Sequence, residues 1–228
     1  MKYRIFLGFD PRQSVSLNVC QFSLFRRASE PLAITSLVLE QLPLERKGLT
    51  PFSFSRFLVP YLCDFHGWAL FMDADIIAQD DICDLWRYID PKKAVIVSEG
   101  VKPFERAAVM LFNCGHPDNR VLTPEYVEKA DNLHVIGWTQ NVGFFPERWN
   151  HCVGYAERRE DPALIHYTMG VPAFKKTADC EHADKWLAEF RAMNSVATWD
   201  ELMGPSIHAV EIEGELQPRY KLNDGRAA

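Results

Sequence analysis

The sequence has no long hydrophobic run and no excess of basic residues. No stretch of about 18 consecutive apolar residues, the length needed to span a membrane as a helix, occurs in the chain. The N-terminus enters an apolar segment at Tyr3 without the basic and apolar regions of a signal peptide, so we expect a cytoplasmic protein without a transmembrane segment. The net charge is −6 and the basic residues are dispersed. This argues against a nucleic-acid partner, because phosphate backbones are bound by clustered lysine and arginine.

The cysteines form no recognisable pattern either. All six stand singly and no C-x-x-C pair occurs, which argues against a zinc site or a disulfide framework and indicates reduced core thiols. Repeats and low-complexity tracts are absent as well. With 228 residues, 47% hydrophobic and 25% charged, the chain has the composition of one globular domain. We expect this domain to span residues 1–222, followed by a frayed tail at 223–228.

Apolar segments of strand type alternate with segments of helix type along the chain. The patterns of buried strands lie at residues 3–9, 33–39, 68–72, 94–97, 107–112 and 163–166. Helix-start signals occur at Asp10, Thr50, Asp81 and Thr123. This alternation predicts an α/β fold with a mostly parallel central sheet and helices on both faces.

Asp73 and Asp75 directly follow the strand predicted at residues 68–72. Mg²⁺ and Mn²⁺ prefer oxygen ligands and are commonly held by one or two carboxylates, with phosphate oxygens completing the shell. In open α/β sheets, ligands bind beyond the carboxyl ends of the strands, which is where this D-x-D motif is expected. The alternative is structural, since the pair would also serve as turn and capping aspartates in front of the helix that starts at Asp81.

Four segments occur in an order that resembles a known family. They are residues 5–10, which end in Phe9 and Asp10; residues 54–60, which contain Arg56; residues 71–77 with the D-x-D motif; and residues 165–172, an H-x-x-x-G loop with His166 and Gly170. Together they resemble nucleotide-sugar-dependent glycosyltransferases of the GT-A fold, most closely glycosyltransferase family 8. The resemblance spans residues 3–176 and implies a single GT-A domain whose first half is Rossmann-like and binds a nucleotide.

The resemblance also implies a divalent metal site. Asp73 would contact the ribose and the metal, Asp75 would ligate the metal directly, and His166 would be the third protein ligand. Imidazole is a good ligand for manganese, and a residue at a strand end is aimed at the same sheet edge as the carboxylates. The alternative for His166 is a hydrogen-bonded loop histidine, and for the other six histidines this structural interpretation is preferred.

Other residues are assigned roles by the same resemblance. Arg56 would pair with a phosphate or hold a carboxylate, with a surface salt bridge as the alternative. Phe9 and Asp10 would lie near the nucleotide, although Asp10 would serve equally as a helix N-cap. Asn113 would face the donor sugar and Gln140 would stabilise positive charge at the anomeric carbon, and both are candidate catalytic residues.

The sequence departs from the family after Gly170. The family continues to K-P-W with its lysine on the diphosphate, whereas here Val171 and Pro172 follow, and Lys175 or Lys176 would have to supply that charge. The segment around Gln140 also matches the family's motif poorly, so the identities of the sugar and the acceptor cannot be carried over from the family.

The predicted function is metal-dependent transfer of a hexose from a UDP-sugar to a hydroxyl acceptor such as a glycan, with Mn²⁺ or Mg²⁺ as cofactor. By resemblance, the anomeric configuration would be retained. Two alternatives stay open: a metal-dependent phosphohydrolase or nucleotidyltransferase, and a non-catalytic module that binds nucleotide sugars or glycans. Peripheral contact with a membrane is also left open, and the sequence does not fix the oligomeric state.

Overall fold

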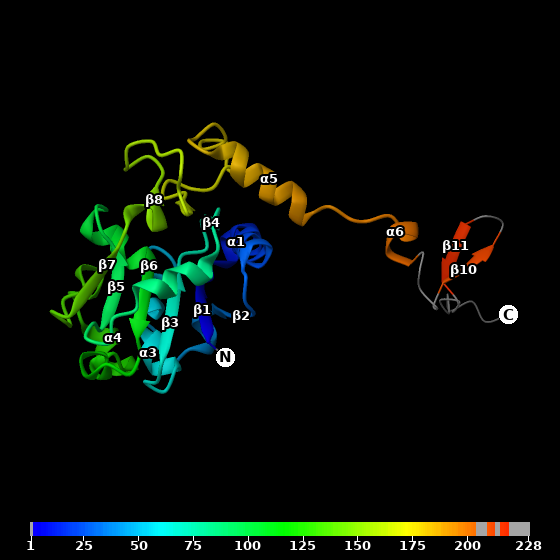
Figure 1. Cartoon of the computed structure of the whole chain (residues 1–228). Coiled ribbons are helices and arrows are strands. Elements are labelled where there is room, and N and C mark those ends of the chain that lie inside the picture. The colour runs from blue at the N-terminus through cyan, green and yellow to red at the C-terminus, as the bar shows by residue number, and fades with distance from the viewer. Residues whose placement is uncertain (1, 204–208, 213–214, 219–228) are drawn as a thin grey trace. The chain divides into compact units, whose positions relative to one another are not determined.

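A six-stranded central sheet organises the structure, a computed structural model that describes residues 2–203, 209–212 and 215–218. Its strands are β1 (Tyr3–Gly8), β2 (Leu32–Leu37), β3 (Trp68–Met72), β5 (Val95–Ser98), β6 (Val109–Asn113) and β7 (Val142–Phe145). They lie in the order β2-β1-β3-β6-β5-β7 (Figure 1). β1 is parallel to β2 and β3, and β5 is parallel to β7, whereas β6 is antiparallel to both of its neighbours. The predicted α/β fold with a mostly parallel sheet is confirmed.

Side-chain alternation divides the core between the two faces of this sheet. Ile5 and Leu7 pack in one buried cluster, whereas Phe6 packs in the other. Leu70 and Phe71 of β3 separate in the same way. This is the period-two pattern of a strand buried on both faces.

Helices cover each of these faces, as predicted. On the first face, α1 (Ser14–Arg27) contributes Leu17, Cys20 and Leu24 to the cluster of Ile5. The second face is covered by three short helices: α2 (Phe52–Ser55), η3 (Arg56–Leu58) and α3 (Val59–Leu62). The single helix expected after Thr50 is therefore broken, with Pro60 in the first turn of α3, where its missing N–H costs nothing.

A second, three-stranded sheet lies beyond the end of β3. It consists of β4 (Ile76–Ala78), β9 (Leu164–His166) and β8 (His151–Cys152), in the order β4-β9-β8. β4 pairs antiparallel with β9, so that Ile76 lies opposite His166. β8 pairs in parallel with β9, so that Cys152 also lies beside His166. The chain thus returns late in the sequence to the residues that directly follow the D-x-D motif.

Short helices make most of the remaining connections. Asp81 caps η4 (Ile82–Tyr88) by accepting a hydrogen bond from the Cys83 N–H at 2.9 Å, and Thr123 caps α4 (Pro124–Lys129) in the same manner. All six cysteines are free and five are buried, as expected of core thiols. The remaining elements are η1 (Pro11–Gln13), η2 (Leu39–Gln41), η4 (Ile82–Tyr88), η5 (Pro103–Ala108), η6 (Pro117–Val121), α4 (Pro124–Lys129), η7 (Leu133–Val135), η8 (Glu147–Asn150) and α5 (Ala183–Met193).

The chain divides into two compact units, residues 1–190 and residues 191–228. Within the second unit, α6 (Trp199–Met203) precedes a hairpin of β10 (Ala209–Ile212) and β11 (Glu215–Pro218). A single domain over residues 1–222 stays a prediction, and the tail at 223–228 lies outside the described residues. Among the described helices, none is both long and apolar enough to cross a membrane.

Candidate functional site

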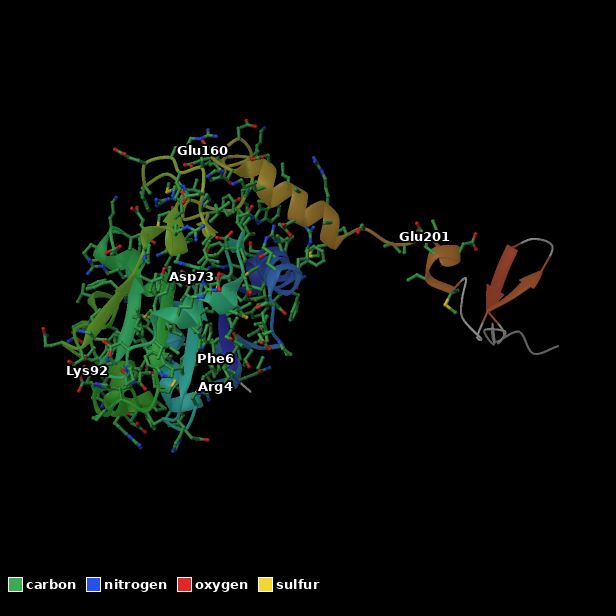
Figure 2. The ribbon with its side chains drawn as sticks, in the orientation of Figure 1. Arg4, Phe6, Asp73, Lys92, Glu160 and Glu201 are labelled. Atoms are coloured by element: carbon green, nitrogen blue, oxygen red, sulfur yellow. The ribbon has the colours of Figure 1, made fainter. Side chains whose placement is uncertain are left out.

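Asp73 and Asp75 lie in the turn that joins β3 to β4. The Asp73 N–H donates to the carbonyl of Ala108 at 2.9 Å, which extends the pairing of β3 with the chain before β6. The Asp75 carbonyl accepts from the Tyr167 N–H at 3.0 Å, which ties the turn to the residue after β9. These two bonds tie the turn to both sheets and help to fix where the carboxylates sit; Asp73 is labelled in Figure 2, at the upper end of β3.

His166 joins the two carboxylates because of the register between β4 and β9. Its Nε2 lies 3.4 Å from Asp75 Oδ1. Asp73, Asp75 and His166 each offer a ligand atom within 4.8 Å of the others. Side chains that are far apart in the sequence are thus brought together at one point.

The donor set fits a divalent cation. Asp73 Oδ1 and Asp75 Oδ1 are buried and have no hydrogen-bond partner among the described residues. Arg56 Nη1 lies 3.1 Å from the first oxygen and His166 Nε2 lies 3.4 Å from the second, but neither is in hydrogen-bonding geometry. Buried carboxylate oxygens without a donor are costly. Two carboxylates and an imidazole are suitable ligands for Mn²⁺ or Mg²⁺.

Asn150 determines which nitrogen of His166 faces the carboxylates. Its Nδ2 donates to the carbonyl of Glu105 at 2.9 Å, which orients the amide so that Oδ1 faces His166 Nδ1 at 3.0 Å. Because an amide oxygen only accepts hydrogen bonds, Nδ1 carries the hydrogen, and in the neutral ring Nε2 presents its lone pair towards Asp75. A histidine whose second nitrogen is held in this way is typical of metal sites.

Arg56 positions Asp73 from within the protein. Besides its ion pair with Asp73, Arg56 Nη1 donates to the carbonyl of Ala107 at 2.8 Å, and the whole side chain is buried. Burial raises the pKa of Asp73 to about 7, with Arg56 opposing the shift and Asp75 adding to it. Burial alone would lower the pKa of His166, but the Asp75 carboxylate raises it well above its ordinary value. The cluster therefore retains protons when no cation neutralises its carboxylates.

A pocket of 750 Å³ opens beside this cluster, and Asp73, Asp75, His166, Arg56, Gly170 and Lys175 all line it. Arg12 and Lys176 add further positive charge to its wall. Phe104, Met169 and Phe174 also line the pocket and are exposed by 62%, 63% and 44%. The pocket thus combines a cation-binding group, several basic side chains and an apolar rim.

Gly170 occupies a backbone conformation that the loop requires. Its φ is +112°, which is unfavourable for residues with a side chain, and a Cβ there would lie 3.2 Å from Phe174 Cδ2. This glycine therefore allows the chain to turn back, so that Lys175 reaches the pocket wall.

Asp10 and Phe9 lie beside this region and not on the wall of the main pocket. The Asp10 carboxylate accepts from the Arg12 N–H at 2.9 Å and forms an ion pair with the Arg12 side chain at 2.6 Å. The hydrogen bonds from Arg12 hold the pKa of Asp10 below its usual value. Asp10 and Asp75 both line a separate cavity of 40 Å³, while Phe9 packs against the core cluster of Ile5. The N-cap alternative for Asp10 is the one that the structure supports.

Asn113 and Gln140 require a correction. β6 runs antiparallel to β3, with Asn113 opposite Trp68, the first residue of β3. Asn113 Nδ2 donates to the carbonyl of Pro91 at 3.2 Å, beside Lys92, which lies at the end of the sheet away from Asp73 in Figure 2. Gln140 is exposed and precedes β7 at this same end. Because the strands separate them from the pocket, we withdraw both as catalytic candidates.

Several residues of the site carry no recognisable sequence signal. Asn150 and Cys152 lie against His166 only because β8 pairs with β9, and no spacing rule connects them. Glu105 and His134 line the pocket from η5 and η7. His134 stacks on Phe104 with ring centroids 5.0 Å apart, and no sequence motif distinguishes it from the other histidines.

Comparison with known proteins places the chain in a structural context. No family model matches it. Protein CDI of Arabidopsis thaliana is 36% identical, and the alignment covers 84% of this chain and 87% of that protein. Among solved structures, the glycosyltransferase GlyE of Streptococcus pneumoniae has a TM-score of 0.61 at 15% identity, covering 90% of this chain and 62% of GlyE.

Two further structures show the same similarity. The bifunctional glycosyltransferase WbbM has a TM-score of 0.60 at 12% identity, covering 88% of this chain and 50% of WbbM. The galactosyltransferase LgtC, solved with donor and acceptor sugar analogues, has a TM-score of 0.55 at 15% identity, covering 87% of this chain and 99% of LgtC. The chain thus spans about half the length of WbbM and about three fifths of GlyE. At these identities the similarity shows the fold, which is GT-A.

Proposed function

This chain belongs to the protein family of Protein CDI of Arabidopsis thaliana, and from its GT-A fold and its pocket we propose that it is a glycosyltransferase. The reaction is the transfer of a hexose from a UDP-sugar to a hydroxyl group of an acceptor. One observation carries the proposal: the buried carboxylate of Asp73, the partly buried carboxylate of Asp75 and an oriented imidazole converge on the wall of a 750 Å³ pocket. The assignment to glycosyltransferase family 8 belongs to the same proposal and is based on the order of the sequence motifs.

Asp73, Asp75 and His166 would hold Mn²⁺ or Mg²⁺. When bound, the ion neutralises the charge that accumulates on the departing diphosphate. The orphaned carboxylate oxygens are the observation that supports this assignment. Arg56 holds Asp73 in place from the protein side, so it acts as a positioning residue and not as a phosphate ligand.

The basic side chains of the pocket would contact the rest of the diphosphate. Lys175 and Lys176 are exposed on its wall, and their ammonium groups supply charge that the overall composition lacks. They take the place of the lysine that the K-P-W motif would provide. The apolar rim of Phe104, Met169 and Phe174 offers flat surfaces on which a nucleobase or a sugar ring can pack.

Retention of configuration is proposed from the resemblance alone, since Gln140 lies outside the pocket. Among the described lining residues, Glu105 is the carboxylate that is not already assigned to the cation. Its position beside the cluster makes it the side chain best placed to face the transferred sugar.

A screen of nucleotide sugars in the presence of Mn²⁺, scored by release of UDP or GDP, tests the function. We expect UDP release that requires the metal and is lost in the Asp75→Asn variant. Hydrolysis of nucleoside triphosphates without UDP release from any sugar donor would identify a phosphohydrolase or nucleotidyltransferase instead. Tight UDP binding with neither transfer nor donor hydrolysis would identify a binding module. An NMR spectrum of the glycoside product determines the anomeric outcome.

A further inference from the structure

A second group of metal-ligating side chains lies outside the pocket. His151 Nε2 and His182 Nε2 each lie 3.0 Å from the same carboxylate oxygen, Glu181 Oε1. The carbonyl oxygen of Arg159 lies 2.9 Å from His182 Nε2. Both imidazoles are buried, with side chains only 1% and 3% exposed. Three side-chain ligand atoms thus lie within 4.8 Å of one another, and a backbone oxygen lies beside His182.

The separations are close to those of a tetrahedral zinc site. Zinc binds histidine nitrogen and carboxylate oxygen at about 2.0–2.1 Å, so neighbouring ligand atoms in a tetrahedron lie about 3.3–3.4 Å apart. The observed separations of 3.0, 3.0 and 2.9 Å need to widen by only about 0.3–0.5 Å to reach this geometry. Two imidazoles and a carboxylate are also a donor set that zinc uses in proteins.

We propose that His151, Glu181 and His182 bind a structural Zn²⁺ ion, with the carbonyl oxygen of Arg159 as the fourth ligand. This site is distinct from the cluster of Asp73, Asp75 and His166. His151 and Cys152 are consecutive residues of β8, and successive side chains of a strand point to opposite faces. Cys152 lies against His166, so His151 faces the other side of the strand.

The location explains what such an ion would do. The long segment from residue 153 to residue 182 contains only one described strand, β9. The ion would connect β8 to Arg159 and to Glu181 and His182, which lie at the two ends of this segment. Tyr167, the residue after His166, donates its hydroxyl to the carbonyl of His182 at 2.8 Å. The zinc site would thereby fasten the loop that carries Gly170 and Lys175, because metal binding is coupled to the stability of the fold that forms the site.

A zinc titration in an Asp75→Asn background tests the proposal, since this background removes zinc binding at the first cluster. Chelator-treated protein is titrated with Zn²⁺ against a chromogenic zinc indicator. We expect one zinc per chain and a rise in the thermal midpoint on zinc addition. His182→Gln in the same background should weaken zinc binding more than about 100-fold, because the loss of even an outer partner of a metal ligand costs about 10–100-fold. His116→Gln, which changes a histidine outside the group, is the matched control and should bind zinc normally.

The X-ray absorption spectrum identifies the ligands independently of any variant. Imidazole and oxygen scattering without sulfur is expected. Sulfur scattering would assign the ion to the neighbouring group of Glu105, Cys152 and His166 and would overturn the proposal. Absence of stoichiometric zinc in the folded Asp75→Asn protein would mean that His151, Glu181 and His182 form only a hydrogen-bonded network. Glu181→Gln, which keeps the size of the side chain and an acceptor oxygen, covers the case in which His182→Gln fails to fold. None of these readouts depends on glycosyl transfer.

Discussion

Replacement of Asn150 by serine should weaken metal binding, although Asn150 would not itself contact the metal. The Asn150 side chain is fully buried: its Nδ2 donates to the carbonyl of Glu105, and its Oδ1 accepts from His166 Nδ1. Serine is too short to make both. The imidazole of His166 would then lose the acceptor that keeps its hydrogen on Nδ1 and its lone pair directed at Asp75.

The size of the effects on metal affinity and on stability follows from these two hydrogen bonds. Loss of the outer partner of a metal-binding histidine typically costs about 10–100-fold in metal affinity, which is about 1.4–2.8 kcal/mol. Stability should fall as well, because the carbonyl of Glu105 and Nδ1 of His166 are left buried without a partner. At about 1–3 kcal/mol for each group, the free energy of unfolding would fall by about 2–6 kcal/mol if neither group found a new partner. The lower end is expected, because serine leaves space that a water molecule can fill.

Asn119→Ser is the matched control for this prediction. Asn119 is equally buried, donates to the carbonyls of Ala94 and Asn113 at 2.7 and 2.8 Å, and accepts from Trp138 Nε1. It lies at the opposite end of the sheet, so its loss should lower stability comparably and leave Mn²⁺ affinity within about twofold of wild type. Urea unfolding gives the stability, and Mn²⁺ titration by calorimetry below the unfolding transition gives the affinity. Unchanged Mn²⁺ affinity in Asn150→Ser, or an equal loss in both variants, would refute the orienting role.

Three further predictions concern the pocket. Asp75→Asn should abolish Mn²⁺-dependent turnover while the protein stays folded. Its control, Asp81→Asn, should retain activity, because asparagine and aspartate cap helices about equally well. Near wild-type turnover of Asp75→Asn would return the motif to a structural role. UDP should bind at least about tenfold more weakly in chelator than in Mn²⁺, since a bound divalent cation would be the largest positive charge beside the diphosphate. Equal affinity by calorimetry would instead point to Lys175 and its neighbours. Arg56→Met should destabilise the fold by about 3–5 kcal/mol in urea unfolding, because it leaves the buried Asp73 carboxylate unpaired; a loss below about 1 kcal/mol would show that the ion pair is not structurally important.

Five of the six strands of the central sheet were predictable because they carry a strong local signal, whereas β7 was not predicted and the strand expected at residues 163–166 belongs to the second sheet. A segment such as residues 68–72 is buried on both faces, so it is a nearly continuous apolar run that needs no tertiary information to recognise. The helices were less predictable. The segment after Thr50 contains Pro60 and the buried Arg56, and it folds into three short pieces because packing against β3 and β6 decides its path.

The site was predictable where a residue lies at the end of a strand with a clear apolar sequence pattern. Asp73 and Asp75 follow β3, and their position needs only the direction of that strand. Asn113 was placed at the wrong end because the sequence does not reveal that β6 runs antiparallel to β3. Asn150 had no signal at all, since its contact with His166 depends on the pairing of two strands of two and three residues.

The register between β4 and β9 is therefore the most sensitive element of the proposed site. Ile76 lies opposite His166 in an antiparallel pair of only three residues. A slip by one residue would place Ile165 where His166 now stands and would turn the imidazole to the other face of the sheet. Packing opposes such a slip, because Leu164 is fully buried with Ile76 and Ala78 in the cluster of Ile5 and a slip of β9 would remove it from this cluster. Hydrophobic packing of the residues beside Asp75 and His166 on these strands thus sets the position of the imidazole relative to Asp75. This explains how so short a pair of strands can hold a site whose ligands must be placed to a fraction of an ångström.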